Sequence, residues 1–291
     1  MNMKINDINP GFGAEISGID LSKPLDPDVV ERIKNAVQEK VVVVFHGQQL
    51  DSAQQVAFSQ LFGPPELPWR HMRGEMNGLV EHSAISMIGN VDEQGQIISK
   101  DDRRRLNQRG NMLWHTDSSY RHPSGLFTFL YGCHIPKMGG GTQFADTRAA
   151  YDALPEATKQ RIDGLRVEHN LDRTFAEAGS PRLTDSEKRI LPPVGHSLVR
   201  VHPSTGRKAL YLGSPASRIA GWSVEDSRKL LDELTTHSTQ RQFILTHRWS
   251  PDDLVMWDNR SSLHRGEAFN EGEFKRQLRR ITVSDLDTIP A

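Results

Sequence analysis

The sequence predicts a mainly β fold with helical decoration, of the jelly-roll or barrel type. Many short runs rich in Val, Ile and Phe end at Gly, Pro, Asn or Asp, as strands do. Only a few segments have the apolar spacing of a helix, and they lie between these runs. No break in composition divides the chain, so we expect one domain over residues 1–291.

Composition narrows the class of protein. The 36 Lys and Arg balance 37 Asp and Glu, which predicts no nucleic-acid partner. Cys133 is the one cysteine, so no disulfide can form within the chain, and we expect a cytoplasmic protein with Cys133 as a buried, inert thiol. The N-terminus has no signal-peptide pattern, and no run approaches the roughly 18 apolar residues of a membrane helix.

The first third of the chain alternates strands and helices. A helix follows the capping candidates Asp26 and Asp28, and Asp51 caps another that closes at Gly63 and Pro64. The expected elements are strands at 3–9, 14–21 and 41–45 and helices at 29–40 and 52–61.

Residues 64–110 are polar and weakly periodic. A long irregular segment in a compact domain is usually functional or disordered, so we expect a lid over the active site here. The expected strands beyond it are 126–132, 142–144, 196–201, 208–212, 242–246, 254–257, 263–265 and 276–283, with helices at 146–154, 155–165 and 223–237.

His115 and Asp117 form the first candidate site. If this stretch is a strand, both side chains point to the same face, which puts an imidazole and a carboxylate beside each other. Two histidines and one carboxylate bind non-haem Fe(II) and leave coordination positions open. The alternative is a strand-end histidine hydrogen-bonded to a nearby carboxylate. We expect His264, on a strand late in the chain, to be the second histidine ligand of this site.

Arg276 and Arg280 follow His264 and would share one face of a strand with Leu278 and Thr282. If that face is buried, each guanidinium needs an anion, and its planar fork matches a carboxylate. The alternative is a solvated basic edge strand, which protects a sheet against aggregation.

The chain resembles the TauD/TfdA family of Fe(II)- and 2-oxoglutarate-dependent dioxygenases over nearly its whole length. Within that family, it most resembles the aryloxyalkanoate branch. The residues that carry the resemblance are 13–21, 43–48, 57–58, 62–64, 114–118, 140–155, 256–260, 264–265, 276 and 280–282. It implies a double-stranded β-helix, which is a jelly-roll core, and a homo-oligomer.

The resemblance also implies roles for individual residues. His115, Asp117 and His264 would bind Fe(2+), and Thr142 and Arg276 would hold the distal carboxylate of 2-oxoglutarate, the cosubstrate with O2. Trp257 and Asn111 match positions near the metal, with Trp257 on the cosubstrate side and Asn111 on the substrate side. Arg280 would bind the anionic substrate.

The substrate pocket departs from the herbicide-degrading members. His202 matches one of their histidines but can also be an ordinary strand-end histidine. His71 and Arg218 stand where those enzymes have a lysine and a histidine, and both could still add positive charge beside the substrate.

The sequence therefore predicts a dioxygenase that oxidises a small anionic molecule and releases succinate and CO2, with ether cleavage if the substrate is an aryloxyacetate. One alternative is a dioxygenase for taurine-like alkylsulfonates. The other is a metal-binding jelly-roll without turnover that senses a ligand.

Overall fold

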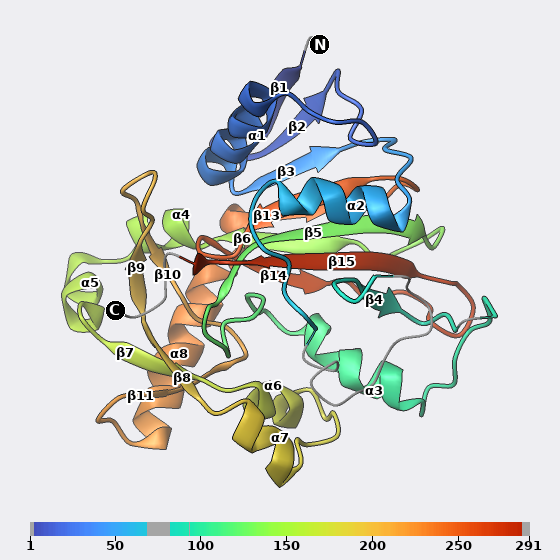
Figure 1. Cartoon of the computed structure of the whole chain (residues 1–291). Coiled ribbons are helices and arrows are strands. Elements are labelled where there is room, and N and C mark those ends of the chain that lie inside the picture. The colour runs from blue at the N-terminus through green and yellow to red at the C-terminus, as the bar shows by residue number, and fades with distance from the viewer. Residues whose placement is uncertain (1–2, 69–81, 93, 287–291) are drawn as a thin grey trace.

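The computed structural model describes residues 3–68, 82–92 and 94–286, and its strands and helices form a layered β fold (Figure 1). The strands are β1 (Lys4–Asn9), β2 (Phe12–Ser17), β3 (Val42–Phe45), β4 (Ser86–Gly89), β5 (Gly125–His134), β6 (Thr142–Asp146), β7 (Arg166–His169), β8 (Val194–Ser197), β9 (Val199–Val201), β10 (Lys208–Leu210), β11 (Ala216–Ile219), β12 (Ile244–His247), β13 (Leu254–Asp258), β14 (Ser262–Gly266) and β15 (Gln277–Ser284). The helices are α1 (Pro27–Lys40), α2 (Ser52–Gln60), α3 (Arg103–Gln108), α4 (Thr147–Asp152), α5 (Glu156–Ile162), α6 (Leu171–Glu177), α7 (Asp185–Ile190) and α8 (Val224–Ser238), with 3-10 turns at η2 (Arg109–Met112) and η3 (Arg241–Phe243).

Two sheets form the jelly-roll core. The larger has the strand order β1-β2-β3-β13-β5-β15-β4, and the smaller has the order β12-β6-β14. Side chains from the two sheets meet in one buried cluster, in which Phe144 of β6 and Leu245 of β12 contact Val255 and Trp257 of β13. The expected mainly β fold with a jelly-roll core is confirmed.

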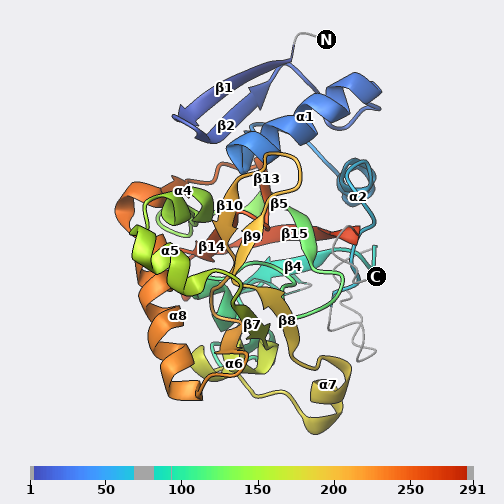
Figure 2. The same ribbon diagram turned by 90° about the vertical axis from the view of Figure 1, so that its left-hand side faces the viewer.

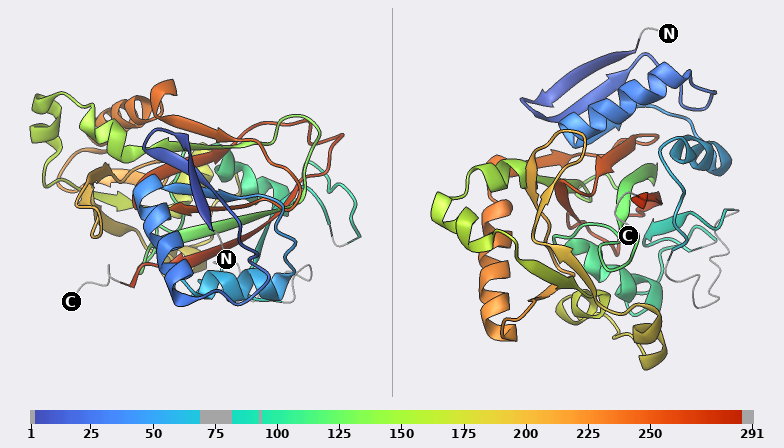
Figure 3. Two further views of the ribbon diagram at one scale, coloured as in Figure 1. Left: turned by 90° about the horizontal axis from the view of Figure 1, so that it is seen from above. Right: turned by 60° about the vertical axis from the view of Figure 1, so that its left-hand side comes forward.

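Helices cover the outer surfaces of this core. α1 and α2 pack on the opposite face of the larger sheet, where Ile33, Val37 and Phe58 are buried with Phe129 (Figures 1 and 2). α4, α5 and α8 lie on the other side of the molecule, around a second core that includes the expected β9–β10 hairpin (Figure 3). In the described part of the chain, no helix has the length and apolarity needed to cross a bilayer.

The sequence missed several short elements. α3, α6 and α7 have six or seven residues each, too few for an apolar period to stand out. The expected lid at 64–110 contains β4, α3 and part of η2, while its residues 69–81 and 93 lie outside the described residues. Cys133 is a free thiol that is half-buried rather than fully buried as expected, and its burial raises its pKa, which disfavours the reactive thiolate.

Candidate functional site

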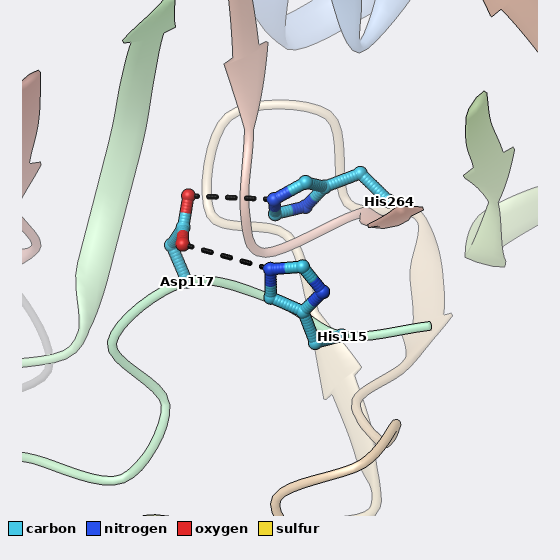
Figure 4. A group of neighbouring side chains, drawn as sticks. All are labelled: His115, Asp117 and His264. Carbon is cyan, nitrogen blue, oxygen red and sulfur yellow. Dashed lines mark ion pairs between the residues drawn. The ribbon is translucent and has the colours of Figure 1, made fainter. Parts of the chain in front are cut away.

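His115 and Asp117, two residues apart, converge in the core with the distant His264. His115 Nε2 lies 3.9 Å from Asp117 Oδ1, and His264 Nε2 lies 3.5 Å from Asp117 Oδ2 (Figure 4). All three residues are buried, and their ligand atoms lie within 4.8 Å of one another. Among the described residues this is the one group of three or more His, Cys, Asp or Glu side chains that could hold a metal ion.

The protonation states suit a metal ion. Burial lowers the pKa of both imidazoles, which keeps them neutral with a lone pair for coordination. His115 Nδ1 lies 2.7 Å from the carbonyl oxygen of Leu113, so it carries the proton and Nε2 faces Asp117. Burial alone would raise the pKa of Asp117, but Arg280 and the two histidines outweigh it and lower that pKa to about 2.

Backbone pairing sets the distance between the two histidines. His115 N donates to His264 O at 3.0 Å and His264 N donates to His115 O at 2.8 Å, an isolated antiparallel bridge. The expected strand through His115 is therefore wrong, because it reduces to this single bridge between η2 and a turn. The convergence still holds, because the bridge fixes His115 beside β14 and the turn brings Asp117 back toward it.

Hydrogen bonds from neighbouring strands hold Asp117 in place. Thr128 of β5 donates to Asp117 Oδ2 at 2.9 Å, and the backbone N–H of Asp117 lies 3.3 Å from Asn259 Oδ1. Trp257 donates its indole N–H to the same amide oxygen at 3.0 Å, and its ring packs on His264 at 4.7 Å between centroids. Thr128 thus holds the carboxylate itself, while Asn259, fixed by Trp257, holds the backbone of the same residue.

The two arginines converge as predicted, although Arg276 directly precedes β15 and only Arg280 lies within the strand. β15 pairs with β5 on one side and β4 on the other, so the alternative of a basic edge strand is wrong. Arg280 Nη1 donates to Asp117 Oδ1 at 2.9 Å. Arg276 is 8% exposed, and its Nε donates to Gly140 O at 2.9 Å. Both arginines and Leu278 line one cavity of about 40 Å³ with His115 and His264.

Thr142 gives that cavity a polar corner, and Trp249 supports it from behind. Thr142, the first residue of β6, is buried and lines the cavity. Trp249 donates its indole N–H to Thr142 Oγ1 at 3.0 Å, which occupies an oxygen lone pair and leaves the hydroxyl proton free to donate. Sequence reasoning missed Trp249, because the partner that defines its role is 107 residues away. A Cβ on Gly140, at a φ of +70°, would lie 3.2 Å from Arg276 Cδ, so this turn needs glycine.

The remaining predicted residues divide into three groups. Asn111 and Trp257 line the same small cavity. His202 does not line it; its Nε2 lies 3.0 Å from Asp258 Oδ2, and its Nδ1 accepts from the backbone of Ser204 and Thr205.

Arg218 is also outside the cavity, on β11, where it pairs with Glu168 at 3.0 Å in a half-exposed position. The predicted substrate contact at His71 lies outside the described residues. The structure therefore does not bring His202 or Arg218 to the cavity that holds Arg280, because each side chain is turned to a carboxylate of its own.

The arrangement can bind a divalent metal on one face and an anion beside it. Two neutral imidazoles and one carboxylate occupy one side of the metal position and leave the other side to small ligands. Arg276 and Thr142 offer donors to one carboxylate, and Arg280 offers donors to a second anion.

Comparisons with known proteins agree with this chemistry. Residues 4–282 match the family described as taurine catabolism dioxygenase TauD, TfdA family. The α-ketoglutarate-dependent 2,4-dichlorophenoxyacetate dioxygenase of Cupriavidus pinatubonensis is 38% identical over 98% of this chain and 99% of that protein. The (S)-phenoxypropionate/α-ketoglutarate-dioxygenase of Sphingobium herbicidovorans is 34% identical over 90% of this chain and 88% of that protein.

A solved structure shares the fold closely. The crystal structure of AAD-2 in complex with Mn(II) and N-oxalylglycine superposes with a TM-score of 0.92, at 38% identity over 98% of each chain. N-oxalylglycine is a structural analogue of 2-oxoglutarate, and Mn(II) takes the same kinds of ligand as Fe(II).

Proposed function

This chain belongs to the TauD/TfdA family of Fe(II)- and 2-oxoglutarate-dependent dioxygenases, and on that premise we propose that it cleaves the ether of a small aryloxyalkanoate. The observation that carries the substrate class is Arg280, whose guanidinium contacts Asp117 and lines the cavity beside the histidines. A substrate carboxylate bound there would lie next to the metal. The relatives named for phenoxy acids support an aryl ether attached to that carboxylate.

Roles for the individual residues follow from their chemistry. We assign His115, Asp117 and His264 as the Fe(2+) ligands, since they are the clustered neutral imidazoles and low-pKa carboxylate. Arg276 and Thr142 bind the distal carboxylate of 2-oxoglutarate, with Trp249 fixing the Thr142 hydroxyl.

Trp257 and Asn111 complete the pocket around these groups. Trp257 supports His264 and the Asn259 amide, while Asn111 faces the substrate side of the cavity. The buried position of the site keeps bulk water from the reacting carbon.

When bound, iron and 2-oxoglutarate activate O2, one oxygen atom leaving in succinate, which forms with CO2, and the other passing to the substrate. Arg280 holds the substrate carboxylate so that the carbon between it and the ether oxygen faces the metal. Hydroxylation of that carbon gives a hemiacetal, which breaks its carbon–oxygen bond to release a phenol and a 2-oxo acid.

A substrate panel tests this proposal. Protein loaded with Fe(II) under anaerobic conditions is exposed to O2 with 2-oxoglutarate and phenoxyacetate, 2-phenoxypropionate, a benzenesulfonate or taurine, and succinate and phenol are measured. We expect phenoxy acids to stimulate succinate formation with one phenol per succinate. Arg280→Leu should lose that stimulation, while Arg241→Leu, an exposed arginine on η3, should keep it.

Three outcomes contradict it. Stimulation by the sulfonates alone makes this chain an alkylsulfonate dioxygenase. Equal succinate formation by His115→Ala removes the metal assignment, and metal and anion binding without any O2 consumption makes the chain a non-catalytic ligand sensor.

The wider organisation is also part of the proposal. We infer one domain over residues 1–291 that works in the cytoplasm as a homo-oligomer, with the 64–110 segment as the lid of the site. Within the described part, β4 belongs to the larger sheet, and the lid is supported by α3 and η2, whose residues line the adjoining cavity and lead to Asn111. Light scattering of the purified protein measures the oligomeric state, and a monomer at micromolar concentration contradicts it.

A further inference from the structure

A second, larger cavity adjoins the metal cluster. It measures about 230 Å³ and lies between the described end of the 64–110 segment and the loop that precedes β15. The two cavities have lining residues in common, namely Ile88, Asn111, Gly266 and Arg276. A ligand that leaves the larger cavity past Arg276 therefore arrives at the cavity with the metal-binding histidines.

Cations predominate in the lining of the larger cavity. Its charged residues are Lys100, Arg105, Arg109, Arg276, Glu267 and Glu271. Four cations face two carboxylates: Arg105 pairs with Glu271, and Glu267 accepts a hydrogen bond from the neutral amide of Gln143 at 3.0 Å and keeps its negative charge.

Two of the cations keep an uncompensated charge. Lys100 is exposed and makes no ion pair with any residue in the described ranges. Arg109 donates to the neutral carbonyl of Gly179 at 3.1 Å, which leaves its charge in place. The mouth of this cavity therefore carries a positive field toward solvent.

Arg276 stands at the inner end of this field. It is buried, and burial lowers its pKa to about 10, although Glu271 acts in the opposite direction. No carboxylate of the described chain forms an ion pair with it, while its Nε is fixed on Gly140 O. A buried cation of this kind is stabilised when an anion arrives.

The walls of the cavity are tied together before any ligand binds. Asn90 donates to the carbonyls of Glu271 and Phe274 at 2.8 and 2.9 Å and accepts from Arg276 N at 2.8 Å. The Arg105–Glu271 pair joins α3 to the same loop. Charges on such fixed walls act on the rate of encounter more than on the final complex.

We propose that this cavity is the entry vestibule for the dicarboxylate cosubstrate, with Lys100 and Arg109 as the residues that steer it toward Arg276. The proposal rests on the 2-oxoglutarate dependence of the chain and not on the aryloxyalkanoate proposed above. Succinate, also a dianion, leaves by the same opening.

Binding kinetics test the vestibule without turnover. Mn(II)-loaded protein is mixed with N-oxalylglycine in a stopped-flow instrument, and the fluorescence of the tryptophans beside the site reports binding. Lys100→Glu/Arg109→Glu should lower the association rate constant by about tenfold at low ionic strength, and the deficit should shrink as salt is added. The dissociation rate constant should change by less than about twofold, because neither side chain belongs to the final cradle.

A matched control reverses two charges elsewhere. Lys229→Glu/Arg241→Glu changes two exposed residues of α8 and η3 that line neither cavity, and it should bind N-oxalylglycine at the rate of the unmodified protein. An unchanged association rate in the double variant overturns the proposal, as does an equal fall in the control.

A second arm separates the two sources of a carboxylate. Association of phenoxyacetate with protein already saturated with Mn(II) and N-oxalylglycine should not respond to the double reversal. If phenoxyacetate slows and N-oxalylglycine does not, the cavity serves the primary substrate and the proposal is overturned. If phenoxyacetate binds neither the unmodified protein nor any variant, the proposed substrate is wrong. The vestibule proposal is still tested in that case, because the N-oxalylglycine measurement does not depend on the primary substrate.

Discussion

Replacing Arg276 by glutamine removes the charge that we assign to the cosubstrate while it keeps a side-chain donor for Gly140. Without a ligand, the guanidinium is a buried cation that has no ion pair in the described chain. Its removal should therefore leave the unfolding temperature unchanged or slightly higher, because burying an unpaired charge is unfavourable.

The ligand-bound state should respond in the opposite way. Two charge-assisted hydrogen bonds from the guanidinium to a carboxylate contribute about 3 kcal/mol, which corresponds to roughly a hundredfold in dissociation constant. At a ligand concentration ~100 times the dissociation constant of the unmodified protein, binding stabilises the fold by about 2.7 kcal/mol. For Arg276→Gln at the same concentration, the stabilisation falls to about 0.4 kcal/mol.

Thermal unfolding measures both states. With Mn(II) and N-oxalylglycine, the unmodified protein should gain about 4 °C and Arg276→Gln less than about 1 °C. Arg241→Gln, an exposed arginine of η3, serves as the control and should gain as much as the unmodified protein. A full ligand shift in Arg276→Gln refutes the cradle, and a ligand-free loss above about 10 °C shows that Arg276 acts through the fold instead.

Three further substitutions separate chemistry from structure. Trp249→Phe removes the N–H that fixes Thr142, so the KM for 2-oxoglutarate should rise about fivefold with kcat little changed, as steady-state kinetics will measure. His202→Asn should lower the unfolding temperature through the lost contact with Asp258 and leave the KM for phenoxyacetate unchanged; a raised KM would restore His202 to the substrate pocket. The pKa of Asp258 is depressed, because Arg260 and His202 outweigh the burial that would raise it. Its ionised form therefore stabilises the fold above the unfolded pKa of 3.8 and loses this contribution as the pH falls below it. Asp258→Asn should be less stable by about 3 kcal/mol at pH 7, and denaturant unfolding at lower pH should find the difference shrinking.

Local sequence patterns were sufficient to predict the metal ligands and the two arginines, because their chemistry depends on residue type and spacing. The alternation of a strand predicted one shared face for Arg276 and Arg280, and although Arg276 directly precedes β15, both side chains line the same cavity. The pairing of His115 with Asp117 was visible from two positions in sequence, although the strand that was expected to produce it is a single bridge. In these cases neighbouring residues determine the geometry.

Distant partners decided the cases that sequence reasoning missed. His202 matched a substrate position, but Asp258, 56 residues away, takes its Nε2. Trp249 carries no motif, and only folding brings its indole to Thr142. The vestibule is formed by polar residues of the 64–110 segment and of the loop before β15. Neither sequence has the hydrophobic periodicity of a helix or strand, so the sequence did not predict how they fold.

β15 divides two kinds of constraint between adjacent residues. Arg279 faces α2, where it donates to Leu50 O and Ser52 Oγ and stacks over Tyr131, while Arg280 faces Asp117 on the other side. Variation at position 280 can thus alter which anion is accepted without loosening the helix, and variation at 279 can alter stability without touching selectivity. A one-residue insertion before them would exchange the two faces and abolish both at once.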